Sequence, residues 1–224
     1  MKKNKPLHLV ALSVLTIFIL LLSGCKKDDD DLPNLNTGII FDSRDNTFYA
    51  TITIGWQEWM AENLNYKTDS GSWGNDNNGW IWYDDLGRLY SLETAKIACP
   101  EGWHLPSDQE WKDLEEFLGM NQNDVTKNSI DRPSGDVGLK LKSDEHMVGF
   151  DQGTNEVGFN ALALGIAEPD GFINNPYTNA SFWTSTQKDQ TTYWYRGLDK
   201  DNNGIARQAI DVEYSLSVRC IKDE

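Results

Sequence analysis

The side chains of this sequence that could carry chemistry are its histidines, its carboxylates and one Asp/Asn-rich loop. His104 has the chemistry of a general base, but no serine or cysteine nucleophile motif accompanies it, so we interpret it as a packed structural histidine. The 35 acidic residues leave a glycosidase-like pair open, although no spacing identifies one. Asp199–Gly204 matches the first half of a calcium loop, but Ile210 stands where that loop needs a bidentate glutamate. A turn between strands is therefore the better interpretation, and no metal site or cofactor is predicted.

The N-terminus indicates a different chemistry, the attachment of lipid. Three lysines within residues 1–5 precede an apolar run of 14 positions, Leu9 to Leu22. A membrane-spanning helix needs roughly 20 residues, so the run indicates a signal peptide. Leu22-Ser23-Gly24-Cys25 resembles the bacterial lipobox. The resemblance implies cleavage before Cys25 and acylation of its new N-terminus. The alternative is an ordinary cleaved signal with a chance cysteine.

Lipidation of Cys25 leaves two further cysteines, Cys99 and Cys220. In the oxidising compartment of an exported protein, we expect this even pair to form a disulfide. The loop that it closes has about 120 residues, and by loop entropy it stabilises the fold by about 4–5 kcal/mol, less any strain. Zinc is not expected, because no CxxC or HxxxH spacing supplies a ligand set.

The charge of the chain limits its partners. The net charge is −15, and removal of residues 1–24 with their three lysines takes it to −18. An acidic surface argues against nucleic acid, whose phosphates need clustered Lys and Arg. It also repels anionic lipid, so we expect the acyl chains to hold the protein on the membrane.

Residues 25–40 are predicted to form an acidic, flexible tether. Lys26-Lys27 is followed by Asp28 to Asp31, and blocks of like charge stay extended. Acid-rich stretches after a lipidated cysteine resemble the surface-export signals of Bacteroidota lipoproteins. The resemblance implies an outer-membrane lipoprotein displayed on the cell surface, with the periplasmic face as the alternative. The predicted organisation is a signal peptide over 1–24, this tether, and a single domain over 41–224.

The domain sequence predicts short strands around two helices. Alternation over Phe48–Ile54 predicts a half-buried strand with Phe48, Ala50, Ile52 and Ile54 on one face, and Trp56–Leu64 is expected to return as a second strand. Residues 67–85 read as a Gly/Asn/Asp/Ser loop with Trp73, Trp80 and Trp82. The chain is predicted to be irregular over 124–154. Further strands are expected at 158–164, 181–185, 192–198, 205–212 and 216–222.

The two helices are predicted at 91–98 and after Ser107. Ser107 and Glu110 form a capping box, and Gly119 is the expected C-terminal cap. The buried stripe of the second helix is predicted as Trp111, Leu114, Phe117 and Leu118. Two helices among short antiparallel strands indicate a loop-rich α+β fold.

Six segments, in order along the chain, together resemble one family. They are Ile54–Tyr66, Gly87–Tyr90, Cys99–Ser107 with Glu110-Trp111, Gly158–Leu162, Phe182–Thr186 and Ser217–Cys220. The chain is similar over residues 42–223 to the Fibrobacter succinogenes major paralogous domain of Bacteroidota and Fibrobacterota lipoproteins. The resemblance implies a C-type-lectin-like fold, related to the formylglycine-generating domain. That domain's cysteine chemistry is not carried over, because the two remaining cysteines are expected to pair.

The resemblance also suggests a binding region. In receptor-like members of this fold, variable residues lie just before the C-terminus, which corresponds here to Tyr193–Tyr214. The candidate ligand-binding residues of this stretch are Trp194, Asp199, Asp201, Asn203, Arg207 and Gln208. A plain surface hairpin is the alternative. Trp80 and Trp82, beside Asn and Asp, suit stacking on sugars, or else they fill the core.

These observations predict a membrane-anchored, surface-displayed domain that binds a glycan or a protein and is not an enzyme. Two alternatives stay open. The first is an enzyme acting on polysaccharide, and the second is a structural envelope protein without a small ligand.

Overall fold

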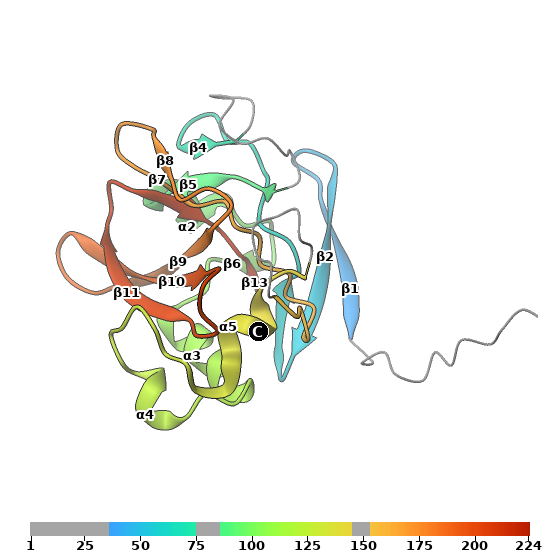
Figure 1. The fold of residues 1–224 in the computed structure, drawn as a ribbon. Coiled ribbons are helices and arrows are strands. Elements are labelled where there is room, and N and C mark those ends of the chain that lie inside the picture. Colours follow the sequence, from blue (N-terminus) through green and yellow to red (C-terminus); the bar gives the residue numbers. More distant parts are fainter. Residues whose placement is uncertain (1–35, 75–85, 145–152) are drawn as a thin grey trace, which may run out of the picture. The chain divides into compact units, whose positions relative to one another are not determined.

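The computed structural model describes residues 36–74, 86–144 and 153–224. All described residues belong to one compact unit, Leu35–Glu224. Over these residues the fold is mostly β, with one antiparallel sheet, one mixed sheet and four short α-helices (Figure 1). None of the described helices is long and apolar enough to cross a membrane.

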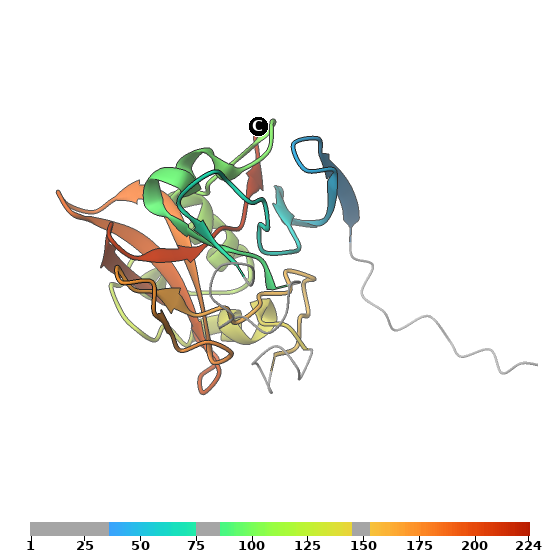
Figure 2. The same cartoon turned by 90° about the horizontal axis from the view of Figure 1, so that it is seen from above.

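The first sheet is antiparallel and contains five strands in the order β1-β2-β3-β13-β6. Its strands are β1 (Thr37–Asp42), β2 (Thr47–Ile54), β3 (Gln57–Met60), β13 (Ile221–Lys222) and β6 (Trp103–His104). β1 and β2 form a hairpin at one side of the domain, across from β9–β11 of the second sheet (Figures 1 and 2). The short β13 brings the last described residues between β3 and β6.

The second sheet contains eight strands, and its main path runs β11-β10-β9-β12-β5-β4. Only β12 and β9 pair in parallel, and the remaining pairs are antiparallel. Its strands are β4 (Ser72–Trp73), β5 (Leu89–Ser91), β7 (Ile166–Ala167), β8 (Ile173–Asn174), β9 (Asn179–Gln187), β10 (Thr192–Asp199), β11 (Ala206–Asp211) and β12 (Ser215–Ser217). β12 and β13 follow one another, so residues 218–220 carry the chain from this sheet into the first.

Two helices, α2 (Leu92–Ala98) and α3 (Asp108–Phe117), lie where the sequence predicts them. Of two further helices, α4 (Gln122–Val125) overlaps the start of the stretch 124–154 predicted to be irregular, and α5 (Val137–Leu141) lies within it, as does a 3₁₀ turn at Ser134–Asp136. They have four and five residues. A helix this short shows no readable periodicity and depends on tertiary contacts, which explains why the sequence does not reveal it.

The capping box that opens α3 is confirmed, since Ser107 accepts from the Glu110 amide and the Glu110 carboxylate accepts from the Ser107 amide. The predicted stripe needs one correction, because Phe117 is 54% exposed. At 3.6 residues per turn Phe117 lies about 120° from Trp111 around the helix axis. The buried face is completed instead by the carboxylates of Asp108 and Glu115.

The alternation predicted for β2 also holds only in part. Ile52 and Ile54 are buried, but Phe48, assigned to the same face, is 66% exposed, while Tyr49 is buried at 1%. The hydrophobic core reaches only the far half of this face, where Ile52 pairs with Trp59 of β3. The strand predicted at 158–164 is an irregular segment with a single bridge, between Ala161 and Lys142.

The core between the sheets is built on four aromatic rings. Trp59 of β3, Trp111 of α3, Phe159 and Phe182 of β9 contact one another with centroid distances of 5.0 to 6.1 Å. All four side chains are fully buried. Because Trp59, Phe182 and Trp111 come from the first sheet, the second sheet and α3, their packing holds α3 against both sheets.

Candidate functional site

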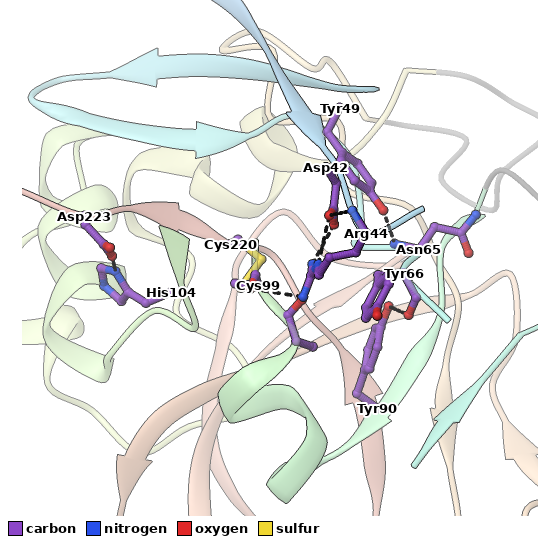
Figure 3. The surroundings of a disulfide bond; sticks show 11 residues. Asp42, Arg44, Tyr49, Asn65, Tyr66, Tyr90, Cys99, His104, Cys220 and Asp223 are labelled. Carbon is purple, nitrogen blue, oxygen red and sulfur yellow. Dashed lines mark hydrogen bonds and ion pairs between the residues drawn. A yellow bond between two sulfur atoms is a disulfide. The ribbon is translucent and has the colours of Figure 1, made fainter. Parts of the chain in front are cut away.

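Cys99 and Cys220 form the predicted disulfide, with their Cα atoms 5.9 Å apart. The bond joins the C-cap of α2 to residue 220 between β12 and β13, across a separation of 121 residues. Arg44 reinforces the same place, because its Nη2 donates to the Ala98 carbonyl at 2.8 Å and pairs with Asp42 at 2.6 Å (Figure 3). A cation at a helix C-terminus is stabilising, so this region has a structural role.

Trp194 and Arg207, two of the predicted binding residues, lie on one face of the β10–β11 hairpin. The Arg207 guanidinium lies 3.6 Å from the centre of the Trp194 ring. Arg207 is buried and donates two hydrogen bonds of 2.8 Å to Asp108. Gln208 points to the other face, where its side chain accepts from the Tyr195 hydroxyl at 3.1 Å. The hairpin therefore does not bring Gln208 together with Trp194 and Arg207.

The other predicted residues of this hairpin, Asp199, Asp201 and Asn203, lie in or beside its turn. The Asp199 carboxylate accepts from the Asp201 amide at 2.8 Å, and the Asn203 carbonyl accepts from Leu139 of α5. The buried Lys142 donates to the carbonyls of Asp199 and Asn202. These contacts hold the turn against α5, and no group of three His, Cys, Asp or Glu side chains in the described residues could hold a metal ion. Cys25, Trp80 and Trp82 lie outside the described residues.

Arg207 is bound to Asp108 because both side chains belong to a buried network of ion pairs. The sequence did not reveal this network. Glu115 of α3 accepts from Arg132 and Arg196, and Asp108 accepts from Arg196, Arg207 and Lys112 at 2.8 Å. Burial alone would raise the pKa of the Asp108 carboxyl, but the hydrogen bond from Arg207 and the charge of Arg196 hold it well below its usual range. The network fastens α3 to β10, β11 and residue 132.

A pocket of about 250 Å³ opens beside the N-terminal half of α3. The turn between β2 and β3, α3 and the end of β13 contribute its walls. Its lining residues are Thr53, Trp56, Gln57, Glu58, Glu110, Asp113, Ile221, Lys222, Asp223 and Glu224. The pocket thus combines one large aromatic ring with five carboxylates, one amide and one ammonium group.

Trp56 forms the aromatic wall of this pocket and is 70% exposed. It follows Gly55, whose φ of +64° allows the two-residue turn between Ile54 and Gln57. The Phe117 ring meets Trp56 edge-on with a centroid distance of 6.2 Å. A Cβ at position 55 would lie 2.9 Å from the Phe117 ring, so only glycine suits this position. Phe117, which lies outside the core, therefore packs against the Trp56 side chain and restricts its orientation.

Hydrogen bonds and an ion pair to other residues of the protein hold the polar side chains of the pocket in place. Gln57 donates to the Glu110 carbonyl at 3.0 Å and accepts from the Trp59 indole at 3.2 Å. Lys222 pairs with Glu58 at 2.7 Å. The Glu110 carboxylate accepts from the amide and the hydroxyl of Ser107 at 2.6 and 2.8 Å. These partners fix the orientation of side chains that would meet a ligand.

His104 of β6 bridges two of the pocket carboxylates. Its Nε2 lies 2.8 Å from Glu110 Oε1, and its Nδ1 lies 2.6 Å from Asp223 Oδ1. Figure 3 shows the contact with Asp223. Burial would lower the pKa of His104, but the hydrogen bonds to Asp223 and Glu110 outweigh it and raise this pKa. The side chain is 40% exposed, so the structural role that the sequence suggested for His104 would be to link two carboxylates at the surface, outside the core.

The sequence contains only part of the signal for this pocket. The capping box identifies Glu110, but it predicts only a hydrogen bond to Ser107 at the start of the helix and no contact with other segments. Asp223 reaches His104 because Ile221 pairs with His104 across the β13–β6 ladder, over 117 residues of sequence. Long-range pairing between two-residue strands leaves no readable pattern, so the pocket was missed.

The arrangement is suited to a hydroxyl-rich ligand. An exposed indole offers an apolar face for the C–H surface of a sugar ring, and carboxylates beside it can accept hydrogen bonds from the sugar hydroxyls. Around the pocket, the five carboxylates outnumber the basic side chains of Lys222 and His104. This excess of negative charge disfavours an anionic ligand.

Comparison with known proteins identifies one family. The family model of the Fibrobacter succinogenes major domain matches residues 52–222, which is most of the described chain. Neither the curated proteins nor the solved structures contain a match. The match includes β3, α3, β13 and almost all of the residues that line the pocket. The chain therefore belongs to the Fibrobacter succinogenes major domain family.

Proposed function

We propose that this protein is a lipid-anchored, surface-displayed module that binds glycans at the Trp56 pocket and performs no chemistry on them. One observation carries the proposal, the exposed Trp56 ring beside oriented carboxylate groups. Aromatic stacking and planar hydrogen-bonding groups together recognise the two kinds of surface that a sugar ring presents.

The lipid anchor is proposed at Cys25. The lipobox-like Leu22-Ser23-Gly24-Cys25 supports it, and so does the use of the other two cysteines. Cys99 and Cys220 are paired with each other, and disulfides of this kind persist in oxidising compartments outside the cytosol. Asp28 to Asp31, which follow the anchor after Lys26-Lys27, support display on the cell surface of a Bacteroidota-type outer membrane.

The proposed fold family is C-type-lectin-like. The short helices α2 and α3, the curled sheet of antiparallel strands and the disulfide that ties the chain's end to α2 all support it. Membership of the Fibrobacter succinogenes major domain family points the same way through the resemblance described above.

The absence of chemistry is proposed because three of the five pocket carboxylates are already held by other side chains of the protein. Glu110 is held by Ser107 and His104, Asp223 by His104 and Glu58 by Lys222. A glycoside hydrolase needs a pair of carboxyl groups that are free to act on the substrate. The group of acids nevertheless makes a polysaccharide-acting enzyme the second candidate.

A glycan array probed with the full chain tests the proposal, with product analysis on each bound glycan. Binding of neutral glycans without cleavage is the expected result. Cleavage of any bound glycan would favour the enzyme. A silent array with a specific protein captured in a pull-down would make the ligand a protein, and silence in both experiments would favour a structural envelope protein.

A further inference from the structure

The outward face of the β1–β2 hairpin is apolar and exposed. Ile39, Phe41 and Phe48 are 74%, 50% and 66% exposed. Phe41 is opposite Phe48 in the ladder, with ring centroids 4.9 Å apart, and Ile39 is opposite Ala50. We call these four residues the hairpin patch. Its side chains form one continuous surface, because residues opposite each other in a ladder share a face of the sheet.

The opposite face of the hairpin is fixed to the domain, so the patch has a defined direction. Tyr49 is buried at 1%, and its hydroxyl accepts from the Asn65 amide at 3.2 Å. Asp42 is also buried at 1% and pairs with Arg44, whose guanidinium reaches the Ala98 carbonyl (Figure 3). The hairpin is therefore not free to fold its apolar face inward.

The four residues of the hairpin patch carry no charge, and beside them the Glu62 carboxylate accepts a hydrogen bond from the Ala50 amide at 2.7 Å. The charged residues between Thr37 and Ala50 are Asp42, Arg44 and Asp45, and all three lie at or beside the turn. Asp42 and Arg44 neutralise each other on the inner side. An occupant would therefore be recognised through apolar surface, and its attraction would not depend on ionic strength.

The position of the patch in the chain, close to Cys25, favours a membrane over a second copy of the chain as its binding partner. β1 begins at Thr37, twelve positions after Cys25. Twelve residues span at most about 40 Å when fully extended. With Cys25 acylated, which is part of the function proposed above, the bilayer would always lie within this reach. A tethered surface is present at high effective concentration, whereas a second copy of the chain is not.

We propose that the hairpin patch inserts into the polar–apolar boundary of the membrane that holds the Cys25 lipid. Aromatic and aliphatic side chains on an uncharged face enter this boundary to a depth of about 5–10 Å. The acyl chains hold the protein on the membrane, and the patch fixes how the domain is oriented above it.

Photo-crosslinking tests this proposal on the lipidated full chain in phosphatidylcholine vesicles. Phe41 and Phe48 are each replaced in turn by p-benzoylphenylalanine, which keeps an aromatic ring at an exposed position. The matched control carries the same group at Ile130, which is 69% exposed and neighbours Ser129, the bridge partner of β11. We expect lipid adducts at positions 41 and 48 at least fivefold above position 130, equal in low and high salt.

Three outcomes would overturn the proposal. They are adducts between two protein chains at positions 41 and 48, equal lipid labelling at all three positions, or no lipid adduct on vesicles that carry the acylated protein. Mass spectrometry of Cys25 separates this failure from failure of the anchor. A chain without acyl groups on Cys25 would overturn both proposals, whereas an acylated chain without adducts would overturn only the insertion of the patch.

Discussion

Nδ1 of His104 lies 2.6 Å from Oδ1 of Asp223, while its Nε2 faces Glu110 at 2.8 Å. Two carboxylate acceptors on one imidazole need two N–H donors, so the folded protein favours the imidazolium form. The contact holds the end of β13 against the start of α3, which places two walls of the pocket. The protonation of His104 is therefore linked to the stability of the region where β13 meets α3.

The first prediction concerns this linkage. The pKa of His104 is raised on folding, so its contribution to stability is complete below the unfolded pKa of about 6.5 and is lost as pH rises through the folded value. We expect His104→Gln to cost more stability at pH 5.5 than at pH 8.5, by less than about 1 kcal/mol because the side chain is partly exposed. Urea unfolding at both pH values measures the difference. A His104 ring that titrates below pH 6.5 by NMR would contradict the explanation.

The second prediction concerns Glu115, the buried carboxylate between Arg132 and Arg196. Glu115→Gln leaves two buried guanidinium groups without their shared counter-charge, which we expect to cost about 3–5 kcal/mol. Glu116→Gln, at the neighbouring and less buried position, is the control and should change stability by less than about 0.5 kcal/mol. Equal effects of the two variants in urea unfolding would show that the network does not act as described.

The third prediction concerns the disulfide. The double variant Cys99→Ala/Cys220→Ala removes a bond that closes 121 residues of chain and should lower the free energy of unfolding by about 4–5 kcal/mol. Using both substitutions avoids a free thiol. Unfolding of the variant and of the oxidised protein in the same urea series provides the comparison. A loss below about 1 kcal/mol would mean that Arg44 and the sheet already fix this junction.

The fourth prediction concerns the anchor. Cys25→Ser should abolish incorporation of labelled palmitate in cells, because the thioether of the diacylglyceryl group needs this sulfur. Cys99→Ala/Cys220→Ala leaves Cys25 intact and is the control, which should keep its label. Labelled Cys25→Ser protein would exclude the lipid site.

In the same cells, protease added from outside should remove the domain if it is displayed on the surface, and a protected domain would place it in the periplasm.

Local signals predicted much of the fold. The capping box identified α3 because both of its hydrogen bonds join residues three apart, and the even number of remaining cysteines identified the disulfide. Phe117 and Phe48 were assigned to the core because apolar residues usually lie there, yet both are exposed. Position around the helix explains Phe117, and the limited reach of the core over β2 explains Phe48.

The site depended on contacts that sequence spacing does not encode. Trp56 was expected within a strand, but Gly55 places it in the exposed turn before β3. Asp223 and Glu110 meet through His104, although 113 residues separate them. The predicted residues of β10–β11 remain a second candidate surface, since Trp194 is half-buried and stacked on Arg207.

The most direct test of the glycan pocket is calorimetric titration of the best-bound array glycan into the wild type, Trp56→Ala and Trp194→Ala. Trp56 projects into solvent beside the pocket, so its removal should leave folding intact. We expect Trp56→Ala to weaken binding at least about tenfold, or about 1.4 kcal/mol, and Trp194→Ala to change the affinity less than about twofold. Unchanged affinity in Trp56→Ala, or a loss confined to Trp194→Ala, would contradict the proposed glycan site.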